Sequence, residues 1–154
     1  DDVCCGFGTV LGFERDHDLI PHDDDIDLIA AFRSDFASNF PEAKRKLKEH
    51  LETHGFTAHG NNLSHFGVTF GSYAACDVFI GFIEGDHVSW FPSRRGTLRY
   101  SSVFPTRAIE IHGVSCTVPF DTEGYLAATY GKDWRIPDTQ FNHPWDASEY
   151  SDLF

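Results

Sequence analysis

The 154-residue sequence contains no methionine, which excludes a translation start at its first residue. We therefore expect the chain to be a piece of something longer. No run of 18 or more apolar residues is present, and this argues against a membrane-spanning helix. There is no Cys-x-x-Cys pair among the four cysteines, Cys4, Cys5, Cys76 and Cys116. Their spacing gives poor support for structural zinc, and four cysteines in a chain of this length do not require disulfides.

Basic residues are scarce, with 12 Lys and Arg against 24 Asp and Glu, for a net charge of −12. This excess of acid argues against nucleic acid or an anionic membrane as a partner. An anionic ligand would need a metal ion and a local cluster of arginines. Aromatic residues make up 15% of the chain, so an ordered core is expected rather than disorder. We expect one domain over residues 1–154.

The most informative segment is acidic and ends in an apolar run. Four aspartates occupy five consecutive positions, namely Asp23, Asp24, Asp25 and Asp27. Like charges this close repel one another unless a cation neutralises them. In a strand, Asp25 and Asp27 would share one face and Ile26 the other. Two carboxylates fixed side by side suit Mg²⁺ or Mn²⁺, which prefer oxygen ligands.

The acidic segment has two simpler interpretations. A run of aspartates is commonly a solvated loop or a helix cap, and this alternative stays open. A calcium-binding EF-hand loop is excluded, because it requires Gly and Glu where this chain has Leu28 and Ser34. His22, beside the acids, is the histidine of greatest interest.

A glycine-rich turn precedes the acids. Gly8 and Thr9 lead into an expected helix over 9–15, where backbone N–H groups and a hydroxyl can face a phosphate. Arg15 follows about one helical turn later and adds a cation. The alternative is that Arg15 only pairs with Asp16 or Asp18 at the surface.

These residues resemble a known signature. The segments Gly8-Thr9-Val10-Leu11-Gly12, Arg15 and Ile20-Pro21-x-Asp23-Asp24-Asp25-Ile26-Asp27 resemble the LicD/fukutin family of the nucleotidyltransferase-fold superfamily. Further matches are Val103-Phe104-Pro105-Thr106-Arg107, Ile109-x-Ile111-x-Gly113, Val118-Pro119, Glu123-Gly124-Tyr125-Leu126 and Tyr130-Gly131-x-x-Trp134-Arg135-x-Pro137. The family usually has tryptophan or a similar residue where His22 stands. The segment that normally precedes the Gly-Thr turn is almost absent here, so we expect an N-terminally truncated domain.

The resemblance implies an α+β fold with a nucleotidyltransferase-like mixed β-sheet flanked by helices. It implies a Mg²⁺- or Mn²⁺-dependent phosphotransferase of the LicD type. Such an enzyme moves a phosphorylated alcohol, such as choline phosphate or ribitol phosphate, from a CDP-linked donor to a glycan, including cell-surface polysaccharide. The compartment would be the cytoplasm in a bacterium or the Golgi lumen in a eukaryote. The rivals are a true nucleotidyltransferase that releases pyrophosphate and a non-catalytic metal- or glycan-binding module.

Site residues follow from the pattern and the resemblance together. Asp25 and Asp27 are expected to hold the metal. Asp77, which opens an expected strand over 76–83, is expected to complete the metal site and to orient or deprotonate the acceptor hydroxyl. The alternative for Asp77 is a simple turn residue. The residues expected to contact substrate phosphate or to offset its charge are Gly8, Thr9, Arg15, Arg94, Arg95 and Arg99.

The remaining pattern predicts the order of elements. Strands are expected over 2–7, 25–32, 56–59 and 66–70, with a hairpin over 108–118. Helices are expected over 41–54 and 121–130. The first of these is preceded by the cap candidates Ser38 and Asn39 and followed by Gly55. Its basic residues Lys44, Arg45, Lys46 and Lys48 are interpreted as a solvated face. Residues 90–107 are expected to be rich in loops, and the chain from 132 to be irregular.

Overall fold

The computed structural model describes residues 2–21, 23, 25–73 and 75–154. The strands are β1 (Val3–Cys5), β2 (Ile26–Phe32), β3 (Thr57–His59), β4 (His65–Thr69), β5 (Cys76–Glu84), β6 (His87–Trp90), β7 (Leu98–Arg99), β8 (Arg107–Ile111) and β9 (Val114–Val118). The helices are α1 (Phe7–Arg15), α2 (Phe40–Thr53), α3 (Tyr100–Val103) and α4 (Thr122–Tyr130), with a 3₁₀ turn η1 (Ser148–Tyr150).

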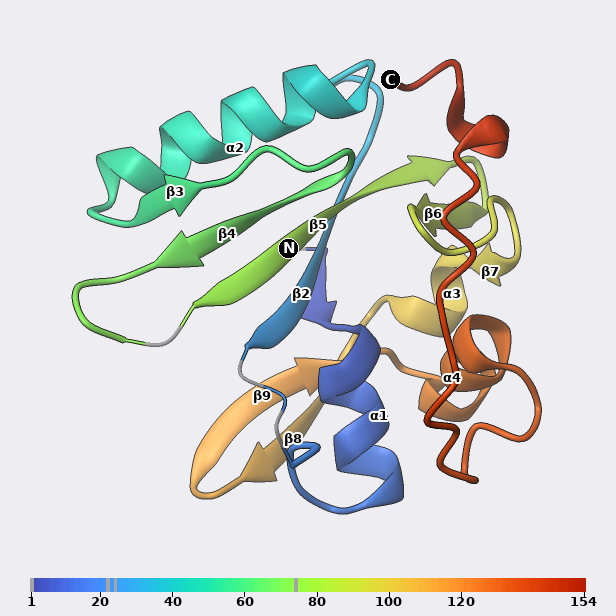
Figure 1. Ribbon diagram of the computed structural model, residues 1–154. Coiled ribbons are helices and arrows are strands. Elements are labelled where there is room, and N and C mark those ends of the chain that lie inside the picture. The colour runs from blue at the N-terminus through green and yellow to red at the C-terminus, as the bar shows by residue number, and fades with distance from the viewer. Residues whose placement is uncertain (1, 22, 24, 74) are drawn as a thin grey trace.

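A mixed seven-stranded sheet forms the centre of the molecule (Figure 1). Five strands follow the order β1-β2-β5-β4-β3, and β6, which pairs with β5, carries β7 on its other edge. Strands β2 and β5 run parallel, and the other described pairs are antiparallel. Strand β5 pairs with β4 along its first half and with β6 along its second half. Strands β8 and β9 form a separate hairpin. The expected α+β fold with a mixed sheet is therefore confirmed.

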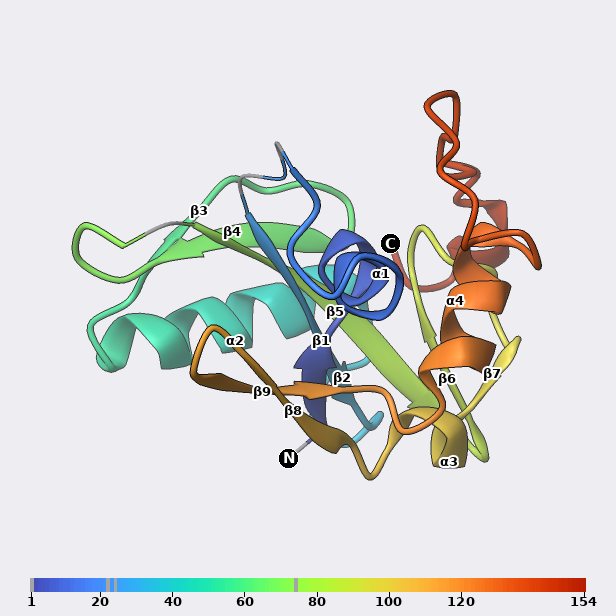
Figure 2. The same ribbon diagram turned by 90° about the horizontal axis from the view of Figure 1, so that it is seen from below.

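The two faces of the sheet carry separate apolar clusters, because alternate residues of a strand point to opposite faces. Ile29 and Phe79 belong to the cluster that includes α1 and α4, whereas Ala30 and Ile80 belong to the cluster that includes α2. Figure 2 shows α1 and α2 on opposite sides of the sheet. Asp27 of β2 and Asp77 of β5 are each two residues from Ile29 and Phe79, respectively. They therefore lie on the same face of the sheet as α1 and α4.

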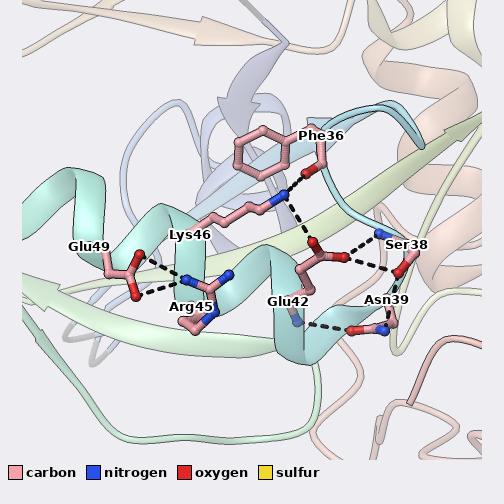
Figure 3. A network of polar contacts seen from close by, with 7 residues as sticks. All are labelled: Phe36, Ser38, Asn39, Glu42, Arg45, Lys46 and Glu49. Atoms are coloured by element: carbon pink, nitrogen blue, oxygen red, sulfur yellow. Dashed lines mark hydrogen bonds and ion pairs between the residues drawn. The ribbon is translucent and has the colours of Figure 1, made fainter.

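Helix α2 lies within one residue of its predicted limits, and its caps explain why. The side chain of Asn39 accepts a hydrogen bond from the Glu42 amide at 2.9 Å, and Gly55 after the helix has φ +85°. The Glu42 carboxylate accepts from the amide and hydroxyl of Ser38 and pairs with Lys46 (Figure 3). The Asn39 side chain thus satisfies one of the N–H groups that the first helical turn leaves unpaired, and the Glu42 carboxylate binds the residue just before the cap.

The interpretation of the basic run as a solvated face is wrong for Lys44, which is 6% exposed. Its ammonium donates to the side-chain oxygen of Asn61 at 3.0 Å and to the carbonyl of Asn62. Lys48 donates to the carbonyl of Gly60 at 2.6 Å. The loop between β3 and β4 thus lies against α2, and its carbonyls compensate the buried charge.

The segment 90–107 is more ordered than predicted. It contains β7 and α3, and β6 ends at Trp90. Val88, Ser89 and Trp90 are all almost fully buried, so β6 is covered on both faces. The alternation His87-Val88-Ser89-Trp90 is the strand signal that the prediction missed. Within the described residues, no helix is both long and apolar enough to cross a membrane.

The Glu42 contacts make stability depend on pH. Hydrogen bonds from Ser38, together with Lys46, lower the pKa of Glu42 from 4.5 to about 2. A depressed folded-state pKa adds stability that is fully present above pH 4.5 and is lost as the pH falls through about 2. We expect Glu42→Gln to lower the free energy of unfolding at pH 7 and to make no difference near pH 2. Urea unfolding across this pH range measures it.

Glu49→Gln is the matched control on the same helix, because Glu49 forms an ion pair with Arg45 at an exposed site. A pH-independent difference between Glu42→Gln and the unmodified chain would contradict the assignment.

Candidate functional site

Three hydrogen bonds fix Asp27 to the turn that begins α1. The Asp27 carbonyl accepts from the Gly6 amide at 2.9 Å, and its amide donates to Oγ1 of Thr9 at 2.9 Å. The carboxylate Oδ2 accepts from the Gly8 amide at 3.0 Å. Gly8 and Thr9 were predicted to cradle a phosphate, which stays a prediction. In this structure they position Asp27.

The predicted acids meet at one end of the two parallel strands. Asp27 and Asp77 are directly opposite each other in the register of β2 and β5. Asp25 lies one residue before β2 begins, so it is at the end of the strand rather than inside it. Burial, and next the charge of Asp25, raise the pKa of Asp27 from 3.8 to about 7, with smaller contributions from Asp23 and Asp77. The Gly8 amide acts in the opposite direction.

This donor set fits a hard divalent cation in chemical terms. The groups are carboxylate oxygens, and after burial, the largest cause, the charges of Asp25, Asp23 and Asp77 each help to raise the pKa of Asp27. In the described part of the chain, no three His, Cys, Asp or Glu side chains are already arranged as a metal site. His22 and Asp24 lie outside the described residues. The metal roles of Asp25, Asp27 and Asp77 stay a prediction.

The backbone at Gly8 lies close to the carboxylates of Asp23 and Asp27. A Cβ added there would lie 2.6 Å from Oδ2 of Asp23 and 3.5 Å from Oδ2 of Asp27. A side chain at this position would therefore displace the Asp23 carboxylate. Glycine is needed here for space and not for its backbone angles.

Helix α1 begins on a strained residue that a buried tyrosine holds in place. Phe7 has φ +38°, in the left-handed region that side-chain-bearing residues rarely adopt. Its amide donates to the hydroxyl of Tyr125 at 2.7 Å, and Tyr125 is fully buried in α4. Tyr125 belongs to the C-terminal segment that resembles the family, so this bond gives that segment a physical role. Strain of this kind is concentrated at functional sites.

Two of the acids, Asp23 and Asp27, line a cavity of about 340 Å³ together with Phe7, Phe141 and His143. The ring of His143 lies edge-on to Phe7, with centroids 5.3 Å apart. Phe141 and His143 come from the tail, which the sequence analysis described only as irregular. The spacing of Phe141, His143 and Trp145, at every second residue, was the available signal.

Arg15 lines an adjoining cavity of about 660 Å³, together with Ile20, Tyr130 and Phe141. Its guanidinium makes a two-pronged contact with Asp16, with nitrogen–oxygen distances of 2.8 to 3.1 Å. Only 15% of the Arg15 side chain is exposed. Both alternatives for this residue therefore have support: it pairs with Asp16, and it lies beside the cavity that adjoins the acids.

The structure does not bring the other three predicted arginines to the acids. Arg95 pairs with Glu84 at the far end of β5, seven residues from Asp77, which is about 23 Å in a strand. Arg94 pairs with Glu149, and Arg99 with Asp86, and both arginines are largely exposed. Their role is to hold the tail and the turn after β5. That these arginines contact substrate phosphate stays a prediction. Sequence proximity to the motif region does not reveal which end of the sheet a loop occupies.

The parallel pair of acid-bearing strands and the turn into α1 define a domain of the nucleotidyltransferase class. A family model described as LicD/FKTN/FKRP, nucleotidyltransferase domain, matches residues 3–121. The chain belongs to this family, as the sequence resemblance predicted.

Curated relatives agree with this membership. Ribitol-5-phosphate transferase FKTN of Mus musculus is 28% identical over 164 residues, which is 95% of this chain and 34% of that protein. The proteins of the same name from Homo sapiens and Macaca fascicularis are each 28% identical over 165 residues, with the same coverage. The chain thus spans about a third of the length of these relatives. Among solved structures, ANT(2″)-Ia in complex with adenylyl-2″-tobramycin matches 75% of this chain and 58% of its own, with TM-score 0.47 and 17% identity.

The bond between Phe7 and Tyr125 predicts a measurable stability change. Tyr125→Phe leaves the buried Phe7 amide without its acceptor, which costs about 1–3 kcal/mol. We expect the free energy of unfolding to fall by about that amount in urea titrations. Tyr73→Phe, at a residue that is 75% exposed, is the control and should change stability by less than about 0.5 kcal/mol. Equal effects of the two substitutions would show that the bond does not stabilise the start of α1.

Proposed function

We propose that this domain is a metal-dependent phosphotransferase. It moves a phosphorylated alcohol of the ribitol phosphate or choline phosphate type from a CDP-linked donor to a glycan hydroxyl. The observation that carries the proposal is the pairing of Asp27 with Asp77 on parallel strands, with Asp23 and Asp25 close enough to raise the pKa of Asp27. Family membership and the ribitol-5-phosphate transferase activity of the FKTN relatives support the choice of transferred group.

Asp25, Asp27 and Asp77 are the residues that would hold Mg²⁺ or Mn²⁺. When bound, the ion would neutralise charge on the donor diphosphate and polarise its oxygens. The Gly8 amide keeps the Asp27 carboxylate oriented. Arg15, at the adjoining cavity, offsets the negative charge that builds up on the transferred group.

The reaction is an in-line displacement at phosphorus. A new bond forms between the acceptor oxygen and the donor's terminal phosphorus as the bond from that phosphorus to the CMP oxygen breaks. CMP leaves as the product, and the hydroxyl proton passes to a carboxylate oxygen of Asp77 or to water. Binding positions both reactants, so geometry and charge supply most of the rate enhancement.

A nucleotide screen tests the class of reaction. We expect CDP and CDP-ribitol to raise the melting temperature in the presence of Mn²⁺, and other nucleoside diphosphates to raise it less. Incubation of CDP-ribitol with the domain should then release CMP. Release of pyrophosphate from a nucleoside triphosphate would support a true nucleotidyltransferase instead. Metal binding with no product at all would support the non-catalytic module.

Substitution of the acids is expected to separate chemistry from folding. Asp27→Asn and Asp25→Asn should abolish metal binding by calorimetry and transfer by CMP release, with an unchanged circular dichroism spectrum. Asp77→Ala should lower turnover by a hundredfold or more, on the order of a lost catalytic ligand. Asp35→Asn, exposed beyond the other end of β2, is the control.

Full metal affinity in both the Asp25 and Asp27 variants would contradict the site assignment. For Asp77, loss of about 1 kcal/mol of stability with retained activity would identify it as a strand-opening residue only.

Arg15→Lys is expected to lose substantial activity although the charge is kept, because lysine does not reproduce the planar two-pronged contact of a guanidinium. A donor titration should show a higher KM, a lower kcat or both. If Arg15 only pairs with Asp16, the substitution will be nearly silent. Unchanged kcat and donor KM would therefore remove Arg15 from the site.

A further inference from the structure

The larger cavity, of about 660 Å³, is continuous with the acid site. The residues that line both this cavity and the smaller one beside Asp23 and Asp27 are Leu11, Ile20, Tyr130 and Phe141. A ligand that contacts the acids can therefore extend into the larger cavity. Its volume lies within the range of about 300–1,000 Å³ that is usual for small-molecule sites.

The tail forms one wall of this cavity and brings apolar surface to it. Ile136 is 69% exposed and Phe141 is 38% exposed, although both are large apolar residues that line the cavity. Tyr130, Trp134 and Pro137, from the segment 130–137 that resembles the family, line it as well. Exposed apolar side chains gathered at a cavity indicate a ligand that covers them.

The aromatic ring of Tyr130 lies where the two cavities meet. Its centroid is 4.9 Å from that of Phe141. Burial, and next the charges of Asp27 and Asp23, raise the pKa of Tyr130. The Arg15 guanidinium acts in the opposite direction. Tyr130 is therefore within electrostatic range of the acids on one side and of Arg15 on the other.

Arg15 brings a positive charge to the larger cavity. Its contact with Asp16 uses Nε and Nη2, whereas a guanidinium has five N–H donors. Arg15 can therefore hold Asp16 and donate to a phosphate at the same time. A diphosphate that extends from Asp27 toward Arg15 would leave its nucleoside in the larger cavity.

Two carboxylates, those of Asp133 and Asp138, also line this cavity. Asp138 is oriented by the Gln140 amide, which donates to its Oδ1 at 2.9 Å. Ionised carboxylates accept hydrogen bonds and do not donate them. Cytosine presents an amino group on its edge, whereas uracil, like thymine, presents a carbonyl oxygen in that place. These carboxylates therefore favour cytosine over uracil.

A nucleobase suits this lining better than the other parts of the two reactants. Both of its faces are flat and stack on aromatic side chains, which is a general way of binding nucleotides. Ribitol is a flexible polyol without a flat face. A neutral acceptor sugar has no anionic group for Arg15 to bind.

We propose that the larger cavity binds the nucleobase of the CDP-linked donor, with the rings of Tyr130 and Phe141 against the base. The carboxylates of Asp133 and Asp138 accept hydrogen bonds from its amino group. This inference rests on the proposed function, because the acid site defines where the diphosphate lies. It adds the part of the chain that binds the nucleoside and a physical reason for a preference for cytosine.

The test compares CDP with inorganic pyrophosphate, which share a diphosphate and differ in the nucleoside. Titration calorimetry in the presence of Mn²⁺ measures both dissociation constants. Phe141→Leu keeps an apolar side chain but removes the flat ring. We expect it to raise the Kd of CDP about tenfold, as for the loss of one base-stacking contact, with no change in the Kd of pyrophosphate.

Three further variants keep the result interpretable. Tyr130→Leu should weaken CDP binding in the same way, and Phe141→Trp should recover it because a flat ring is restored. Phe120→Leu is the matched control, at a phenylalanine that is 59% exposed and precedes the other end of α4. It should leave both dissociation constants unchanged. Thermal melting of each variant confirms that it is folded.

The choice of base tests the two carboxylates. The unmodified domain should bind CDP more tightly than UDP. Asp133→Asn combined with Asp138→Asn should reduce this preference, because an amide can donate to the carbonyl oxygen of uracil. Equal affinity of the unmodified domain for CDP and UDP would overturn the assignment of the carboxylates to the base.

Unchanged CDP affinity in folded Phe141→Leu and Tyr130→Leu would overturn the inference, as would an equal loss of pyrophosphate affinity or an equal effect of Phe120→Leu. A raised acceptor KM with unchanged CDP affinity would place the acceptor in this cavity instead. Metal-dependent CMP release by the unmodified domain would leave the phosphotransferase class intact in each of these cases. If the unmodified domain releases no CMP, the proposed function itself fails and the inference falls with it.

Discussion

The site depends on one constraint, the three hydrogen bonds between Asp27 and the turn from Gly6 to Thr9. It joins the first residues of β2 to the start of α1, so helix and strand cannot shift independently. The Tyr125 hydroxyl then fixes the same turn from α4. Three segments that are far apart in the sequence thereby determine where one carboxylate lies.

These three hydrogen bonds also explain how several aspartates are tolerated at one end of β2 and β5. Burial and neighbouring carboxylates disfavour the charged form of Asp27, while the Gly8 amide favours it. The folded chain thus holds a site of unfavourable charge in place by backbone hydrogen bonds, instead of letting the side chains separate. A cation bound at such a site would be stabilising, because it would remove the repulsion between carboxylates that remains in the folded chain.

Local sequence patterns predict much of this arrangement. The acids ahead of β2, Asp77 at the start of β5 and the cap at Asn39 follow from charge, alternation and helix-end chemistry, and each was predicted. Arg95 and His143 were not, because their roles depend on which end of the sheet a loop reaches. Lys44 was misjudged for a related reason: its burial depends on carbonyls of the β3–β4 loop, which no helical pattern reveals. Local sequence patterns determine where helices and strands form, whereas the contacts of a loop depend on the topology of the whole sheet.

The buried ammonium of Lys44 has a consequence beyond stability. It holds the backbone of Asn62, whose side-chain amide in turn contacts Nε2 of His65. A polar chain therefore runs from a helix on one face of the sheet to an imidazole on the other. Loss of the positive charge at position 44 would remove the contacts that hold the β3–β4 loop against α2, and with them the support for the contact between Asn62 and His65. A substitution in a helix on one face of the sheet would thus be felt beside the acid-bearing strand on the other face.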